Sequence, residues 1–231
     1  MIRDRVAAVR EQIARAAARA GRSPEDVALV AVSKTFPAAA VREAFETGLR
    51  VFGENKVQEA EGKIAALGDL VAQGARFHLV GHLQGNKAKK AAALFECVHS
   101  VDGADLGRRL AAAAEGGRAL RVLVQVDLAG EATKHGVAEG DLLQTLESMR
   151  GLTSLRVEGL MILPPLAPDP AAARPYFRRL RELRDQALAR GFLEGGELSM
   201  GMSHDLEVAI EEGATLVRVG TALFGERPAR Q

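Results

Sequence analysis

In the segment LVAVSKTFP, Lys34 follows a mostly apolar run, and its amine is the first side-chain group that could take part in chemistry. A lysine in this place can simply be the first solvated residue after a strand. If it lies half-buried at the mouth of an apolar core, deprotonation of its amine becomes less costly. A neutral amine is a nucleophile for aldehydes, so the two interpretations differ in function.

Two turns of small residues near the C-terminus, SMGMSHD and RVGTALFG, favour a phosphate site. Glycine lets the backbone approach an oxyanion closely, so Gly201 and Gly220, with the hydroxyls of Ser203 and Thr221, would suit a phosphate. The same residues are common in turns that bind nothing. A phosphate site together with an aldehyde-reactive lysine is the requirement of pyridoxal 5′-phosphate (PLP).

Arg218 lies two residues before Gly220, so both would face the same side of a strand. A guanidinium next to a pyridine nitrogen would keep that nitrogen unprotonated, because a second positive charge is disfavoured there. Arg218 could equally pair with a carboxylate such as Glu54 or Asp102.

The elements that must position these residues alternate strictly along the chain. Short β-branched runs predict eight strands, at residues 27–34, 50–55, 76–82, 97–103, 121–130, 156–163, 196–203 and 216–221. Stretches with helical periodicity separate them, and several predicted helices end on a glycine: Gly48, Gly116, Gly151, Gly191 and Gly213.

Strict alternation of strand and helix indicates parallel strands, and eight repeats indicate a closed (β/α)8 TIM barrel. A doubly wound open sheet would show a Gly-rich phosphate loop after its first strand, and VSKTFP is not one. We therefore predict one domain over residues 1–231, with an extra helix before the first strand and a Pro-rich loop at residues 163–170. The carboxyl ends of the strands should share one rim, where barrels build their sites.

Composition excludes several classes of protein. The net charge of +1 gives no basic footprint for nucleic acid. The single cysteine, Cys97, rules out an internal disulfide and is expected to be buried and inert. The N-terminal segment has no apolar stretch of the length that a signal peptide or membrane span needs, and Ile2, Val6, Val9 and Ile13 recur at helical spacing. We expect a cytoplasmic protein without nucleic-acid or membrane partners.

At these residues the chain resembles the YggS/PROSC family of PLP-binding proteins, also called PLP homeostasis proteins. The resemblance covers nearly the whole chain and includes, in order, LVAVSKTFP, FGENKVQEA, FHLVGHLQGNKAK, VHSVD, GLMILPP and LSMGMSHDLEVAIEEGATLVRVGTALFG. It implies a fold similar to the N-terminal barrel of alanine racemase, with PLP bound to Lys34 as an internal aldimine. It also implies that the ring nitrogen faces Arg218 and that further cofactor-binding residues are Asn55, Met202, Ser203, Gly220 and Thr221.

The resemblance implies a protein that holds PLP in vitamin B6 and amino-acid balance, with no established turnover. Racemisation needs a second base, which in alanine racemase is a tyrosine of a C-terminal β-domain. Here the sequence ends at Gln231 and its only tyrosine, Tyr176, is predicted at the start of an outer helix, so no second base is expected. A monomer that passes PLP transiently to apo-enzymes is the expected form.

Three alternatives stay open. The first is a small PLP-dependent racemase or lyase, with His82 or His204 as the proton shuttle. The second is a barrel that binds a phosphorylated metabolite without PLP. In the third, Lys134 replaces Lys34 as the reactive amine, although its predicted loop is more exposed. No metal site is expected, because the histidines show no spacing such as H-E-x-x-H.

Overall fold

A computed structural model describes residues 1–130 and 135–226. Its sheet contains parallel strands at β1 Ala28–Val32, β2 Val51–Glu54, β3 Arg76–Leu79, β4 Cys97–Val101, β5 Leu120–Asp127, β6 Val137–Ala138, β7 Leu155–Met161, β8 Glu197–Ser199 and β9 Leu216–Val219. The strand order is β4-β3-β2-β1-β9-β8-β7-β5-β6, and an additional β4–β5 pairing closes the ring. Eight of these strands form the barrel, while the two-residue β6 pairs only with β5.

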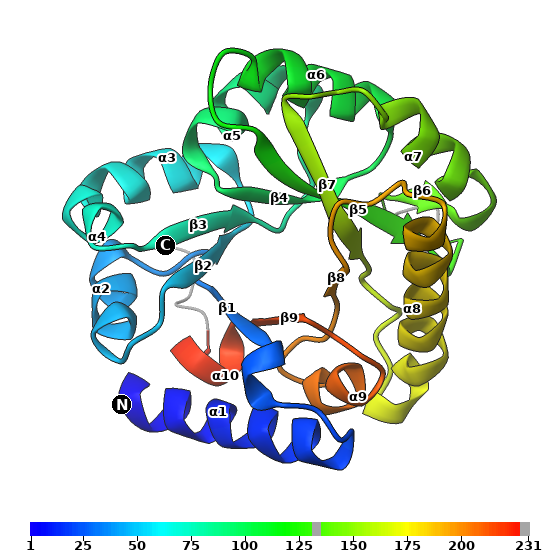
Figure 1. Ribbon diagram of the computed structural model, residues 1–231. Coiled ribbons are helices and arrows are strands. Elements are labelled where there is room, and N and C mark those ends of the chain that lie inside the picture. Colours follow the sequence, from blue (N-terminus) through cyan, green and yellow to red (C-terminus); the bar gives the residue numbers. More distant parts are fainter. Residues whose placement is uncertain (131–134, 227–231) are drawn as a thin grey trace.

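Helices surround the barrel on its outside (Figure 1). The α-helices are α1 Ile2–Arg19, α2 Ala38–Glu46, α3 Val57–Ala66, α4 Gly68–Ala72, α5 Ala88–Leu94, α6 Ala104–Ala114, α7 Leu142–Met149, α8 Arg174–Ala189, α9 Leu206–Glu211 and α10 Thr221–Phe224. Short 3-10 helices are η1 Pro24–Asp26, η2 Gly85–Lys87, η3 Glu139–Asp141 and η4 Pro170–Ala173. The predicted (β/α)8 barrel with an N-terminal helix is confirmed.

The N-terminal helix α1 docks along α9 and α10, as Figure 1 shows at the lower edge of the molecule. Its apolar stripe is buried: Ile2, Val6, Val9 and Ile13. The chain leaves this helix through Gly21, whose φ of 65° is readily adopted only by glycine. The five glycines predicted at helix ends also have positive φ. No helix in the described ranges has the length and apolarity that crossing a bilayer requires.

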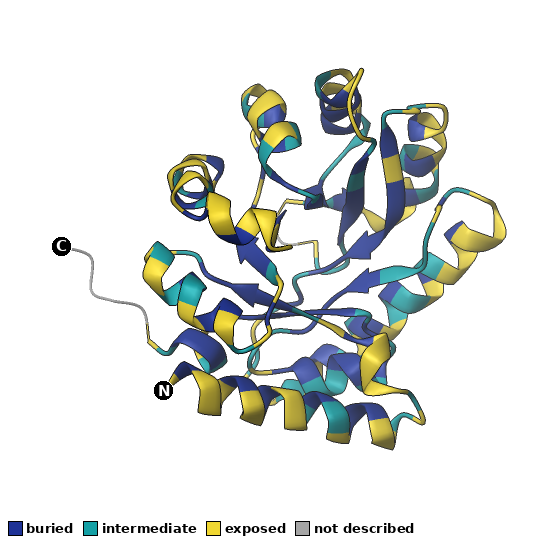
Figure 2. Ribbon diagram, turned by 60° about the vertical axis from the view of Figure 1, so that its left-hand side comes forward, coloured by how far each residue is buried: buried dark blue, intermediate teal, exposed yellow. Residues whose placement is uncertain are grey.

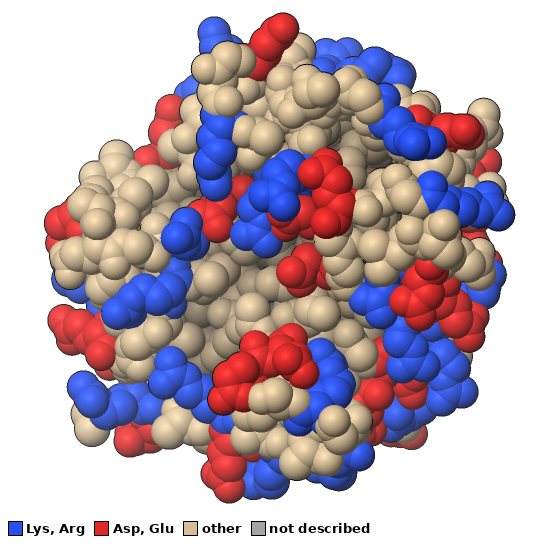
Figure 3. Space-filling model, viewed as in Figure 1, with Lys and Arg blue, Asp and Glu red and all other residues tan. Residues whose placement is uncertain are grey.

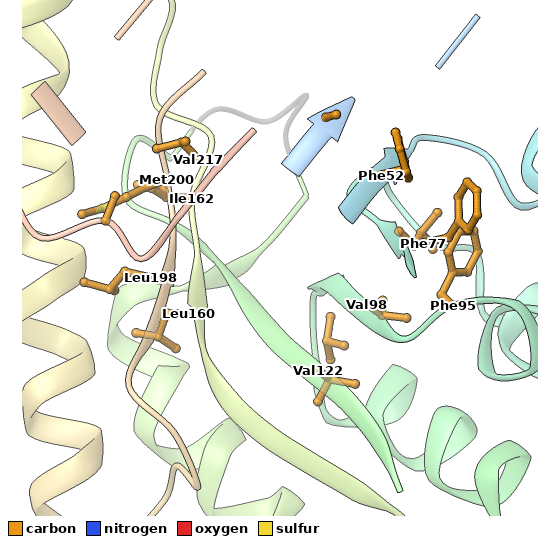
Figure 4. Close-up of a cluster of buried hydrophobic side chains, with 14 of the residues drawn as sticks. Phe52, Phe77, Phe95, Val98, Val122, Leu160, Ile162, Leu198, Met200 and Val217 are labelled. Atoms are coloured by element: carbon orange, nitrogen blue, oxygen red, sulfur yellow. The ribbon is translucent and has the colours of Figure 1, made fainter. Parts of the chain in front are cut away.

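The two faces of each barrel strand pack in different layers. Outward-facing side chains meet the helices in a large apolar core, which Figure 4 shows around Phe52, Phe77 and Phe95. Inward-facing side chains form a smaller apolar cluster, made of Val30, Val32, Val80, Cys97, Leu123, Met161 and Leu216. Figure 2 shows the result, with buried strands inside and exposed helix faces outside. Cys97 is 1 % exposed, and burial raises the pKa of its thiol, as expected of an inert cysteine.

Charged side chains of both signs are interspersed around the amino-terminal mouth of the barrel, the face seen in Figure 3. Arg121 bonds Glu158 and Glu96 there, and Arg76 pairs with Glu96. Positive and negative groups thus neutralise one another at this mouth. The functional sites of such barrels lie at the opposite rim, where the carboxyl ends of the strands meet.

The boundaries of the strands differ from the prediction where polar residues follow them. The first strand ends at Val32, and Ser33 and Lys34 lie in the following turn. The strand predicted at 196–203 covers only Glu197–Ser199, because Gly201 has a φ of 89° and breaks the extended backbone. Residues 162–169 form the predicted loop before η4.

Closure of the barrel requires a glycine where β7 meets β8. A Cβ at Gly159 would lie 2.0 Å from the Glu197 carbonyl oxygen, which is backbone and cannot rotate away. We expect Gly159→Ala to lower the free energy of unfolding by about 3 kcal/mol. Gly62→Ala on the exposed side of α3 meets nothing within 4 Å and should raise it by about 0.5–1 kcal/mol. Urea unfolding of both variants is the measurement, and equal stability of Gly159→Ala and the parent would contradict this account.

Candidate functional site

The structure brings the candidate residues to one end of neighbouring strands. β1 lies between β2 and β9 in the sheet, and Val30 of β1 pairs with Arg218 of β9. The predicted site residues follow or end β1, β2, β8 and β9: Lys34, Asn55, Met202, Ser203, Arg218, Gly220 and Thr221. Lys134 lies outside the described residues.

Lys34 is half-buried in the turn after β1. Val30 and Val32 face the barrel interior, and the same two-residue alternation, continued past the strand, places Lys34 on the interior side. The next residue, Thr35, has a φ of 69°, a left-handed conformation that costs energy in a β-branched residue. The turn must therefore be held in place by its surroundings.

Side chains from β2 and α3 hold this turn on both sides of Lys34. Before it, the Ser33 hydroxyl donates to Glu54 Oε1 at 2.6 Å, and the Ser33 carbonyl accepts from Lys63 Nζ at 2.8 Å. After it, the Thr35 amide donates to Glu59 Oε1 at 2.5 Å. Lys63 also bonds Glu54 Oε1 at 2.7 Å and Glu59 Oε1 at 3.2 Å. We call Ser33, Glu54, Glu59 and Lys63 the turn clamp.

The ion pair of the turn clamp is buried, because the Lys63 side chain is 6 % exposed and that of Glu54 is 0 % exposed. Burial raises the pKa of the Glu54 carboxyl, and the bonds from Lys63 and Ser33 oppose the rise. Glu54 Oε2 has no hydrogen-bond partner within residues 1–130 and 135–226. A buried pair of this kind adds little net stability but is costly to break, so it fixes geometry.

Arg218 is 4 % exposed and lies inside the barrel on β9. Its guanidinium donates to Ser199 Oγ at 2.6 Å and to the Ile162 carbonyl at 2.8 Å. Burial lowers the pKa of Arg218 to about 10, and the negative charge of the buried Asp205 acts in the opposite direction. Among the described residues no carboxylate forms an ion pair with Arg218 at hydrogen-bond distance: Glu54 pairs with Lys63, and Asp102 lies beside His82. The predicted pairing of Arg218 with Glu54 or Asp102 is therefore wrong.

The two small-residue turns pack closely against their neighbours. A Cβ at Gly201 would lie 2.5 Å from the Ala209 Cβ, and a Cβ at Gly220 would lie 3.2 Å from the Val32 carbonyl oxygen, directly before the Lys34 turn. The Ser203 hydroxyl accepts from the Ala222 amide at 3.3 Å, which joins the two turns. Gly220 and Thr221 begin α10.

Met202 is fixed through a hydrogen bond of its amide, and Asn55 is fixed by close packing against Gly81. The Met202 amide donates to Asp205 Oδ1 at 2.6 Å, and both Met202 and Ser203 are half-buried. Asn55 follows β2, and a Cβ at Gly81 would lie 2.3 Å from its carbonyl oxygen and 2.5 Å from its Oδ1. Glycine at position 81 is therefore required for the close packing that fixes Asn55.

The two candidate proton shuttles differ in their surroundings. His82 is exposed at the end of β3, with its Nδ1 3.3 Å from Asp102 Oδ2 and its ring stacked on His135 at 3.5 Å. His204 is exposed and donates from Nε2 to the Ala167 carbonyl at 3.2 Å. Tyr176 lies on α8, as predicted, and packs against the outer core.

Two groups of side chains lie close enough to hold a metal ion, although the sequence spacing suggested none. They are His82, Asp102 and His135 at the rim, and His78, Cys97 and His99 in the interior. Each group combines residues from segments that are far apart in the sequence, so no local motif reveals them.

Sequence reasoning missed Glu59 and Lys63 of the turn clamp, and also His78 and His99. Lys63 lies three residues after Ala60 and six after Val57, on the buried side of α3, and a lysine in an apolar stripe was the available signal. His78 and His99 lie inside strands that alternate in and out, where a polar residue on the inward face marks a buried contact.

The barrel with its N-terminal helix and its polar rim is the fold expected of the alanine racemase N-terminal domain, and comparison with known proteins agrees. The family described as "Alanine racemase, N-terminal domain" matches residues 5–228. The pyridoxal phosphate homeostasis protein of Pseudomonas aeruginosa is 48% identical over 98% of this chain and 96% of its own length. That of Aquifex aeolicus is 44% identical over 97% of both chains. The chain belongs to this family of pyridoxal phosphate homeostasis proteins.

Solved structures give the same result. PipY of Synechococcus elongatus, in a structure with PLP bound, superposes with a TM-score of 0.87 at 41% identity, over 97% of this chain and 100% of that one. Its structure without PLP gives a TM-score of 0.88 at the same identity and coverage. The resemblance noted in the sequence is thereby confirmed.

The turn clamp predicts the behaviour of Lys63→Met. Removing the ammonium leaves the Glu54 carboxylate buried without its cation, so we expect the free energy of unfolding to fall by about 3–5 kcal/mol at pH 7. Glu54→Gln in the same chain removes that charge and should restore much of the loss.

The deficit of Lys63→Met should also depend on pH. The pKa of Glu54 is raised in the folded state, so the stability contributed by its neutral form is present at low pH and is lost as pH rises through that pKa. Urea unfolding should therefore show a smaller deficit at pH 5 than at pH 7. A deficit that is equal at both values would rule out the buried carboxylate as its cause.

Proposed function

We propose that the protein binds PLP, holds it as a Schiff base on Lys34, and serves intracellular PLP and amino-acid homeostasis. The Lys34 amine condenses with the aldehyde of PLP and releases one water molecule. The observation that carries the proposal is Arg218, a buried guanidinium on the strand that pairs with β1, whose side-chain hydrogen bonds within the described residues go to neutral groups. A buried cation of this kind is suited to a ligand that brings an electron-rich atom to it.

The residues at the rim fit the other parts of PLP. In the proposal the pyridine nitrogen faces Arg218, and the phosphate is bound by Ser203, Gly220 and Thr221, whose two turns are joined by the Ser203–Ala222 hydrogen bond. Met202 and Asn55 complete the contacts to the cofactor. Two close contacts support the proposal. The backbone at Gly220 packs against the Val32 carbonyl next to the Lys34 turn, and Gly81 packs against Asn55.

The proposal includes the setting in which this site acts. We take residues 1–231 as one PLP-binding barrel domain that is a monomer in the cytoplasm and passes PLP transiently to apo-enzymes. The interspersed charges of the amino-terminal face are in keeping with a protein that binds neither nucleic acid nor a membrane surface.

Lys34→Ala tests the assignment of the lysine. Purified protein incubated with PLP should show the absorbance band of a Schiff base, and the variant should lose it because the proposed Schiff base is formed by the Lys34 amine. Lys56→Ala, which removes an exposed lysine near the same rim, is the matched control and should keep the band.

Borohydride reduction followed by mass mapping identifies the modified residue directly. The expected adduct is on the peptide that contains Lys34. An adduct on the peptide that contains Lys134, or a band that survives in Lys34→Ala, would overturn the assignment.

The second candidate function is a small PLP-dependent racemase or lyase that acts on amino acids. One observation favours it: His82 Nδ1 lies 3.3 Å from Asp102 Oδ2, an arrangement that can orient an imidazole as a proton shuttle. His204 is a weaker candidate, because its Nε2 is bonded to the Ala167 carbonyl.

Deuterium exchange at Cα separates the two functions. With stoichiometric PLP-loaded protein and a panel of amino acids in heavy water, we expect no exchange above that of free PLP. Exchange that disappears in His82→Ala would favour the enzyme and contradict the proposal of a protein that only holds PLP.

A further inference from the structure

A chain of hydrogen bonds crosses the barrel interior behind Arg218. The guanidinium donates to Ser199 Oγ at 2.6 Å, Ser199 Oγ lies 2.8 Å from His99 Nδ1, and His99 Nε2 lies 2.9 Å from His78 Nδ1. All four side chains are buried, with exposures of 4 % or less. They come from β9, β8, β4 and β3, so the chain spans the barrel from wall to wall.

A guanidinium only donates, so Ser199 Oγ accepts from Arg218. Among the described residues, His99 Nδ1 is the acceptor within hydrogen-bond distance of the Ser199 hydroxyl, so we assign the Ser199 O–H to that bond. In this assignment a neutral His99 carries its hydrogen on Nε2 and donates to His78 Nδ1. A neutral His78 then carries its hydrogen on Nε2, an atom that has no hydrogen-bond partner among the described residues. Every hydrogen bond of the chain is thus donated in the direction away from Arg218.

The surroundings keep both imidazoles neutral. Burial lowers the pKa of His99 well below its usual value, and the positive charges of Arg218 and Arg121 act in the same direction. Burial, together with the positive charges of Arg121 and Arg76 and against the negative charge of Glu96, lowers the pKa of His78 to about 4. The chain lies between cations at both ends, so it supplies hydrogen-bond acceptors to Arg218 without supplying a negative charge.

We propose that Ser199, His99 and His78 are positioning residues that hold the Arg218 guanidinium in place, facing the ring nitrogen of a bound pyridine cofactor, without adding a negative charge beside it. The inference rests on the proposed function and deepens it. A carboxylate in the position of Ser199 would also fix the guanidinium, but it would cancel its charge and allow the ring nitrogen to be protonated. A protonated ring is the stronger electron sink, so the neutral chain favours holding the cofactor over converting substrates on it.

The first test needs no cofactor. Nitrogen-15 NMR of the histidine rings in the unliganded protein at pH 7 should show His78 and His99 both neutral and both protonated on Nε2. A protonated imidazolium, or hydrogen on Nδ1 of either ring, would overturn the chain. Resonances are assigned with His78→Gln and His99→Gln, each of which removes one set of signals.

The second test compares Ser199→Asp with Ser199→Asn, two variants of similar volume that differ in charge. Each is loaded with PLP labelled with nitrogen-15 in the ring, and the ring-nitrogen shift is read at one pH. We expect the parent and Ser199→Asn to give the shift of an unprotonated pyridine and Ser199→Asp to give an upfield, protonated shift. An unchanged shift in Ser199→Asp, or an equal shift in both variants, would overturn the inference.

The two tests separate this inference from the proposed function. Failure of the parent protein to take up PLP overturns the proposed function and the cofactor half of the inference, while the ring tautomers still decide whether the chain exists. If Ser199→Asp does not fold, the tautomers and the ring-nitrogen shift of the parent decide the outcome, since a protonated ring in the parent contradicts the inference.

Discussion

The Lys63 ammonium is the interaction on which the geometry of the rim depends. It is buried, and it bonds the Ser33 carbonyl, Glu54 and Glu59 at once, thereby joining the end of β1 to β2 and α3. Removing such a charge from water costs several kcal/mol, which is recovered only when every bond is formed in the right geometry. The bonds of Lys63 therefore fix the position of the turn more than they add stability. The left-handed conformation of Thr35, beside Lys34, persists because the turn is bonded on both sides.

The two ends of the barrel use charge in opposite ways. At the amino-terminal mouth, arginines are matched by glutamates, as in Arg121 with Glu158, so the face is nearly neutral although rich in charge. Inside the barrel, Arg218 has only neutral acceptors. Hydrogen bonds to neutral groups stabilise a guanidinium less than a carboxylate does. Burial lowers the pKa of Arg218, and the negative charge of Asp205 only partly opposes it. A buried cation of this kind is costly for folding, which is a frequent feature of ligand sites.

The architecture could be predicted from the sequence because periodicity reports local geometry. Alternating strand and helix, glycines at helix ends and the buried stripe of α1 all follow from neighbouring residues. The turn clamp and the histidine chain could not be predicted in the same way. Lys63 and Ser33 are thirty residues apart, and His99 and Ser199 are one hundred apart, so only barrel closure brings them together. β1 and β8 are shorter than predicted because the chain turns directly after them: Ser33 and Lys34 lie in a turn, and Gly201 has a left-handed φ of 89°.

The charge around Arg218 separates two uses of one fold. Binding a cofactor through a lysine requires an amine near an aldehyde and a held phosphate, and neither needs a protonated pyridine ring. Stabilising a carbanion on that ring gains from protonation, which a nearby carboxylate would favour and a bare guanidinium opposes. Ser199 offers Arg218 a hydroxyl oxygen, and the two imidazoles behind Ser199 extend the chain with neutral groups and no anion. In the proposed site the interior of this barrel is suited to keeping a cofactor in place, and the groups that would limit its reactivity lie behind the guanidinium, on the side away from the cofactor.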